Sequence, residues 1–223
     1  MKIYQVEEKL DKLLELLIKN LGASPNAFRS GRWGINGDVL RLLEKNGFQV
    51  DSSMYPFFRN EYFDCEYTSL VPYWPKYDEP MTKGSQRNIL EIPVTAGFNR
   101  NNFGLMQSIS KAIGHPGLRP LRLTGLFWHC RILRKLYLSP ELASADDMKV
   151  LIETALENEL PVIHMYLHSS SLIDGTKSYI NQKDSFNVIC KRIEQVVEHI
   201  YFRSNVRFCT ISEAAALLRE RLN

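Results

Sequence analysis

The chain has 223 residues and lacks several features that mark common functional classes. Its four cysteines are far apart and form no C-x-x-C pair, which argues against a cysteine-rich metal site and favours free thiols in a reducing compartment. No apolar run reaches the roughly 18 residues of a membrane span. The N-terminus is amphipathic and charged, unlike a secretory signal, which predicts a cytoplasmic protein.

The sequence also lacks a strong net charge, internal repeats and low-complexity linkers. The formal charge is only +3 at pH 7, with 28 Lys and Arg against 25 Asp and Glu. No basic run alternates with aromatic residues, so we expect no nucleic-acid partner and see no strong case for an anionic membrane. The length suits one substantial core or at most two small ones, and we expect a single domain over residues 1–223.

The order of helical and strand-like patterns predicts an α/β fold. Apolar residues at spacings of three and four indicate a helix from about residue 3, which Gly22 is placed to end. Asn36 can cap a second helix, and residues 48–52 follow as a strand, so the alternation favours a largely parallel sheet. Further strands are predicted over 88–95, 161–168 and 206–209, and further helices over 103–113, 144–158, from 184 or 185 onward, and from the Thr210–Glu213 capping box.

Residues 53–86 are rich in aromatic residues and prolines, which interrupt regular elements. Long irregular segments often serve binding. One interpretation is that Tyr73 and Trp74 stack against sugar rings as substrate-binding residues. The other is that these aromatics hold a long loop against the core.

Two charged patterns have simple structural explanations. The apolar and basic stretch over 121–138 carries His129, Arg131, Arg134 and Lys135, which we interpret as a solvated helix face. Asp146 and Asp147 fit the first turn of a helix, where the dipole and free amides favour carboxylates over a metal-binding role.

The stretch P-V-I-H-M-Y-L-H-S-S-S (161–171) predicts a strand that ends at His168. Strand ends commonly present catalytic side chains, and imidazole titrates near neutral pH, so His168 is a candidate for proton transfer. The alternative is that it only caps the strand. His164 and His168 spell H-x-x-x-H, but four residues of strand separate them by about 13 Å. We therefore expect no shared metal ion.

Several stretches together resemble the polysaccharide deacetylases, metal-dependent esterases that remove acetyl groups from sugars. The matching stretches are F-R-S-G-R-W-G (28–34), G-F-Q-V-D-S-S (47–53), L-E-I-P-V-T (90–95), residues 161–171, and F-C-T-I-S-E-A-A-A-L-L (208–218). The resemblance implies a distorted, incomplete (β/α) barrel and a carbohydrate substrate. It also implies a zinc or similar divalent ion.

The resemblance assigns roles to individual residues. Arg29 matches the arginine that orients the catalytic aspartate, and His168 matches the general acid. Arg32 and Trp33 lie in the turn whose backbone amides help to stabilise the oxyanion.

The sequence departs from the family pattern at important positions. Gly31 replaces the proline usual in the turn. A Thr-Phe-Asp-Asp-Gly strand end and an H-x-x-x-H pair belong before Arg29. However, the 28 preceding residues contain no histidine and only Asp11 as aspartate. We therefore expect no metal ligands in this chain, an N-terminally truncated domain, and little or no activity without a separate N-terminal segment.

Two other function classes are open. One is a non-catalytic carbohydrate-binding or scaffolding domain that uses the 53–86 segment. The other is a metal-free hydrolase with His168 as base, although no serine or cysteine nucleophile motif accompanies it.

Overall fold

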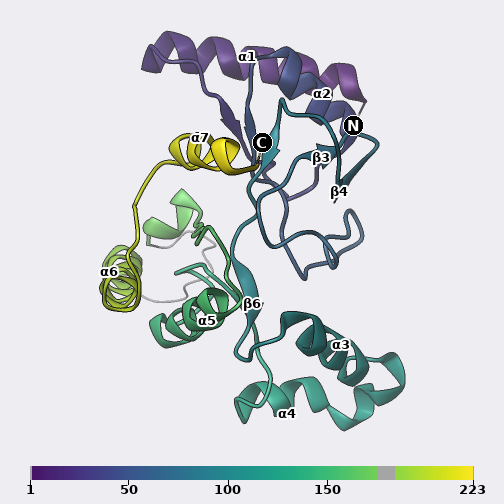
Figure 1. The fold of residues 1–223 in the computed structure, drawn as a ribbon, viewed down its shortest axis with the longest axis vertical. Helices are drawn as coiled ribbons and strands as arrows, with labels where there is room; N and C mark the ends of the chain where they lie inside the picture. Colours follow the sequence, from purple (N-terminus) through teal and green to yellow (C-terminus); the bar gives the residue numbers. More distant parts are fainter. Residues whose placement is uncertain (1, 175–183, 223) are drawn as a thin grey trace. The chain divides into compact units, whose positions relative to one another are not determined.

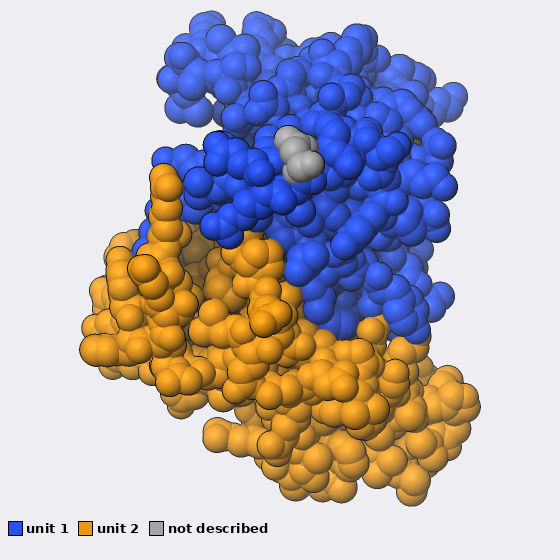
Figure 2. All heavy atoms as spheres, in the orientation of Figure 1, with its two compact units in different colours: residues 1–93, 208–223 blue, residues 94–207 orange. Residues whose placement is uncertain are grey.

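The computed structural model describes residues 2–174 and 184–222, which form a mixed α/β structure (Figure 1). The chain divides into two compact units, coloured separately in Figure 2. Unit 1 comprises residues 1–93 and 208–223, and unit 2 comprises residues 94–207. In the described ranges, no helix is both long and apolar enough to cross a membrane.

Unit 1 is built on a small parallel sheet. Its strand order is β1-β2-β5, with Ala27 opposite Val50 and Val50 opposite Leu90. The predicted parallel sheet is therefore confirmed, although each strand is only two residues long. The elements of unit 1 are α1 (Ile3–Leu21), β1 (Ala27–Phe28), α2 (Gly37–Lys45), β2 (Val50–Asp51), β3 (Pro75–Lys76), β4 (Glu79–Lys83), β5 (Leu90–Glu91) and α7 (Ile211–Leu222).

The helix ends of unit 1 follow the local sequence signals. Gly22 ends α1 in the left-handed conformation at φ 67°, where a glycine has no steric penalty. The Asn36 side chain accepts a hydrogen bond from the Val39 amide and caps α2. At α7, the Thr210 amide donates to Glu213, and the Glu213 amide donates to the Thr210 hydroxyl, which confirms the capping box.

Unit 2 contains an antiparallel strand pair covered by helices. Ala96 pairs with Tyr137 and Phe98 with Lys135, and buried residues of α5 pack against both strands. Glu153 of α5 forms ion pairs with His199 and Arg203 of α6. The elements are β6 (Ala96–Phe98), α3 (Phe103–Ile113), the 3-10 helix η1 (Pro116–Leu121), α4 (Leu123–His129), β7 (Lys135–Tyr137), α5 (Ala145–Glu157), the 3-10 helix η2 (Ser169–Leu172) and α6 (Ser185–Arg203).

Three predicted elements differ from the structure. Residues 161–168 are an extended segment rather than a strand: the His164 amide donates to the Thr95 hydroxyl, and the Tyr166 amide donates to the Leu138 carbonyl. Residues 206–209 form no strand. The 121–138 stretch is not one helix, because it divides into α4 and β7. The described residues form three separate small sheets and no closed barrel.

Candidate functional site

Polar side chains gather where the three parallel strands of unit 1 end. Arg29 follows β1, Asp51 is the last residue of β2, and Glu91 is the last residue of β5. The carboxyl ends of parallel strands meet at one edge of a sheet, which is where α/β proteins commonly bind ligands. We call Arg29, Asp51, Ser52, Ser53 and Glu91 the strand-end cluster.

Arg29 is held by the strand next to its own. Its Nε donates to the Ser52 carbonyl at 3.1 Å, and its Nη2 donates to the Ser52 hydroxyl at 3.0 Å. The guanidinium also lies 5.2 Å from the centroid of the Trp33 ring, which in turn stacks on Tyr55 at 4.6 Å. These contacts fix the direction of Arg29 by hydrogen bonding on one side and cation–π attraction on the other.

Asp51 and Glu91 form a carboxyl pair with no measurable exposure. The two carboxyl groups are register partners on neighbouring strands, and Asp51 Oδ2 and Glu91 Oε2 have no hydrogen-bond partner among the described residues. Ser53 donates to Asp51 Oδ1 at 2.7 Å, and the Met54 amide donates to Glu91 Oε1 at 3.1 Å. Burial raises the pKa of both carboxyl groups, and the Asp51 charge adds to the increase at Glu91. Burial and the neighbouring Asp51 charge therefore both favour the neutral form of Glu91.

Residues 31–33, for which we expect an oxyanion role, form a turn in which the Trp33 amide is engaged. Trp33 adopts φ 62°, and its amide donates to the Ser30 carbonyl at 3.2 Å. Arg32 is exposed at the tip of this turn. In this structure the Trp33 amide therefore closes the turn, and the Trp33 ring packs on Arg29 and Tyr55.

Tyr73 and Trp74 lie inside unit 1, only 2% and 6% exposed. The Tyr73 hydroxyl donates to the Pro80 carbonyl at 2.7 Å, and the Trp74 ring has Arg219 at 4.7 Å from its centroid. A ring that stacks on a sugar needs an accessible face, so this burial does not fit their predicted substrate-binding role. It fits the alternative, in which these aromatics hold the segment to the core.

A second polar cluster lies in unit 2 around His168. Its ring Nδ1 is 2.6 Å from Glu141 Oε1, its backbone amide donates to Glu141 Oε2 at 3.2 Å, and the Ser171 hydroxyl donates to the same oxygen. The Glu141 side chain is fully buried, whereas the His168 side chain is 44% exposed. We call these three residues the histidine cluster.

The histidine cluster has the arrangement of a proton-transfer group. A carboxylate on Nδ1 favours the tautomer with the hydrogen at Nδ1, which leaves Nε2 as the nitrogen that gains or releases a proton. The sequence interpretation identified His168 but not Glu141. One signal was available: Glu141 is the only acidic residue between Ile92 and Ala145.

The described residues do not fit the zinc site that the family resemblance implies. Residues 2–174 and 184–222 contain no group of three or more His, Cys, Asp or Glu side chains able to hold a metal ion. In the strand-end cluster, burial raises the pKa of both carboxyl groups and so disfavours the deprotonated state that a metal needs. Asp147 instead pairs with Arg134 at 2.7 Å.

Comparison with known proteins adds no family assignment. No protein-family model matches the chain, and no curated protein matches it significantly. The resemblance to polysaccharide deacetylases therefore rests on the five sequence stretches alone.

Proposed function

We propose that the protein is polysaccharide deacetylase-like: His168 is the proton donor of a site that acts on acetylated sugars, within a distorted, incomplete (β/α) barrel. The observation that carries the proposal is the contact between His168 Nδ1 and the buried Glu141. A buried carboxylate behind an exposed imidazole supports proton transfer, the role that the resemblance gives to His168. The fixed direction of Arg29 is a second supporting feature.

In this proposal His168 acts on the leaving group. Hydrolysis breaks the bond between the acetyl carbon and the sugar nitrogen or oxygen. The acetyl group gains a hydroxyl from water, and the remaining proton of that water goes to the general base that the family's Asp-Asp motif supplies. Protonated His168 then transfers its Nε2 proton to the leaving amine or alkoxide. Proton transfer by a positioned side chain typically contributes about 10²–10⁴-fold to the rate. Glu141 stabilises the positive charge of the imidazolium before that transfer.

We expect the protein to bind acetylated sugars without hydrolysing them, because the family's Asp-Asp and H-x-x-x-H motifs do not occur before Arg29. Isothermal titration calorimetry with N-acetylated and fully deacetylated chitooligosaccharides tests binding, and an acetate-release assay with added zinc tests turnover. We expect heat only from the acetylated ligand and no acetate. Absence of binding to any acetylated saccharide would contradict the proposal. Acetate release with stoichiometric zinc would instead refute the expected inactivity.

A non-catalytic carbohydrate-binding or scaffolding domain is a second candidate. Tyr62 and Tyr67 of the 53–86 segment are 73% and 74% exposed, and each presents a ring to solvent. If these two rings bind the saccharide, binding should disappear in the double variant Tyr62→Ala/Tyr67→Ala and persist in His168→Gln. The deacetylase-like proposal predicts that saccharide binding persists in Tyr62→Ala/Tyr67→Ala and disappears in His168→Gln.

A further inference from the structure

The small net charge of the chain conceals a strong local separation of charge. Seven of the 28 Lys and Arg lie between Glu91 and Glu141, and no Asp or Glu lies between those two residues. The rest of the chain therefore carries 21 basic side chains against 25 acidic ones. Electrostatic attraction to an anionic partner is consequently concentrated in this one part of unit 2.

This basic segment is also poorly buried. We define the basic lobe as residues 100–135, which include α3, η1 and α4, the teal helices of Figure 1. In α3 only Phe103 and Gln107 are buried, and neither η1 nor α4 contains a buried residue. Such a segment contributes little to a core of its own, so its apolar side chains remain available to a partner.

The exposed side chains of the basic lobe are of two kinds. Large apolar side chains that are 41–62% exposed occur along all three helices and the following turn: Leu105, Leu121, Leu126, Trp128 and Ile132. Exposed basic side chains alternate with them along the chain: Lys111, Arg119, Arg122 and Arg131.

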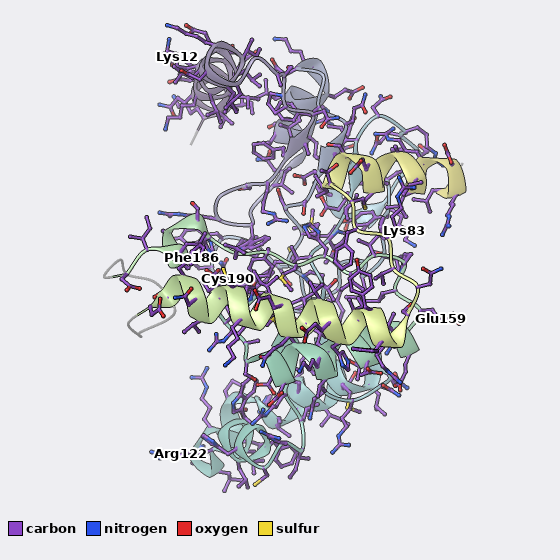
Figure 3. All side chains as sticks on the ribbon, turned by 90° about the vertical axis from the view of Figure 1, so that its left-hand side faces the viewer. Lys12, Lys83, Arg122, Glu159, Phe186 and Cys190 are labelled. Carbon is purple, nitrogen blue, oxygen red and sulfur yellow. The ribbon has the colours of Figure 1, made fainter. Side chains whose placement is uncertain are left out.

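Three of these arginines have no acidic partner. Within residues 2–174 and 184–222, Arg119, Arg122 and Arg131 form no ion pair. Arg122 and Arg131 flank α4, and both have positive φ angles. Figure 3 labels Arg122 on the ribbon of this lobe. Positive charge is therefore placed at both ends of a helix that exposes Leu126 and Trp128.

We propose that the basic lobe docks on an anionic membrane surface. Arginine and lysine near such a surface are attracted to acidic headgroups, while leucine and tryptophan enter the boundary between headgroups and acyl chains. A nucleic acid or an acidic polysaccharide would use the arginines but offers little to exposed Leu121, Leu126 and Ile132. The combination of both side-chain classes favours lipid.

Flotation of the full chain with vesicles tests the proposal. We expect binding to phosphatidylcholine vesicles that contain phosphatidylglycerol, little binding to phosphatidylcholine alone, and loss of binding as salt is raised. The charge-reversal variant Arg119→Glu/Arg122→Glu/Arg131→Glu should bind at least about tenfold more weakly. The matched control Lys19→Glu/Lys83→Glu/Lys191→Glu changes the net charge equally, uses exposed residues outside the lobe, and should bind much more strongly than the lobe variant.

A second measurement examines insertion without relying on the folding of charge variants. Lipids brominated in the acyl chain quench the fluorescence of a tryptophan that reaches them. We expect such vesicles to quench the native chain and to quench Trp128→Phe much less, because Trp33 and Trp74 lie outside the lobe. The variant Leu121→Gln/Leu126→Gln should bind lipid more weakly while heparin binding is unchanged.

Three outcomes would overturn the proposal. The first is that the lobe variant and the control variant lose binding equally. The second is that the native chain binds equally to vesicles with and without phosphatidylglycerol. The third is that brominated lipids do not quench Trp128. Binding to duplex DNA or heparin that is as strong as binding to lipid, and indifferent to Leu121 and Leu126, would assign the lobe to a soluble polyanion instead. Circular dichroism of each variant verifies that it is folded.

Discussion

Asp51 and Glu91 are register partners on neighbouring parallel strands, and both residues are fully buried. The two residues that follow Asp51 bind the end of β1: Arg29 bonds to Ser52, and the Ser30 amide donates to Ser53. Ser53 in turn donates to Asp51. Asp51 is therefore linked through Ser53 to the Ser30 amide, which follows Arg29 after β1.

The carboxyl pair should make unit 1 less stable as pH rises. Both pKa values are raised in the folded state, so the folded protein binds more protons than the unfolded chain. The contribution of the two carboxyl groups to the unfolding free energy is complete below their unfolded-state pKa values of about 4. It is lost as pH rises towards their folded-state pKa values. In Glu91→Gln the amide can donate to Asp51 without taking up a proton. We expect the variant to lose less unfolding free energy than the native chain between about pH 5 and pH 8.

Urea unfolding at the two pH values measures this difference. Glu8→Gln is the matched control, because Glu8 lies exposed on α1 of the same unit. Its stability should follow the pH dependence of the native chain. If the stability of Glu91→Gln has the same pH dependence as that of the native chain, Glu91 does not take up a proton on folding.

Removal of Glu141 should destabilise unit 2. It should also remove the contact that orients the His168 ring. The Ser171 hydroxyl is buried and donates to Glu141, so Glu141→Ala leaves a buried donor unsatisfied. The expected loss is about 1–3 kcal/mol of unfolding free energy. Glu194→Ala, at an exposed position of α6, should change stability by less than about 0.5 kcal/mol.

A tautomer measurement separates positioning from simple stabilisation. Nitrogen NMR of histidine-labelled protein reports whether neutral His168 carries its hydrogen on Nδ1 or Nε2. We expect Nδ1 protonation in the native chain and a mixture in Glu141→Ala. An unchanged tautomer in a folded Glu141→Ala protein would show that the carboxylate does not orient the ring.

Periodicity and capping signals predicted the helices and the parallel sheet, because both act over short distances in the chain. Gly22, Asn36 and the Thr210–Glu213 box all lie at the helix ends that they indicated. The extended segment over 161–168 was predicted as a strand, since its residues are strand-like. A ladder also needs a neighbouring edge, and that edge cannot be read from the segment itself.

The polar clusters were harder to predict, because their partners are far apart in sequence. Asp51 and Glu91 are separated by 40 positions, and Glu141 and His168 by 27. Asp51, Glu91 and Glu141 each resemble any acidic residue in or beside an apolar stretch. The burial of Tyr73 and Trp74 was also undetermined, since aromatic composition is the same for a packed loop and a binding loop. The basic lobe was missed because net charge was averaged over the whole chain.

Arg29 and Arg32 should respond differently to removal, although they lie three residues apart. Arg29→Ala loses two hydrogen bonds to Ser52 and the contact with the Trp33 ring. We expect a loss of about 1–3 kcal/mol of unfolding free energy. Arg32 is exposed, so Arg32→Ala should cost less than about 0.5 kcal/mol. Equal effects in urea unfolding would contradict a structural role for Arg29 at the strand-end cluster.

Gly37 and Gly125 provide a matched pair of glycine-to-alanine substitutions. A Cβ atom at Gly37 would lie 1.8 Å from the Tyr77 carbonyl oxygen, which is backbone and cannot rotate away. The first turn of α2 or the Tyr77 segment must then shift, so we expect Gly37→Ala to lose about 3 kcal/mol of unfolding free energy.

A Cβ atom at Gly125 meets nothing within 4 Å, and this residue lies inside α4. Gly125→Ala should therefore stabilise α4 by about 0.5–1 kcal/mol, since alanine restricts the unfolded chain. Urea unfolding measures the first effect, and hydrogen exchange of the α4 amides measures the second. A neutral Gly37→Ala would mean that α2 and Tyr77 do not approach each other as closely as the structure places them.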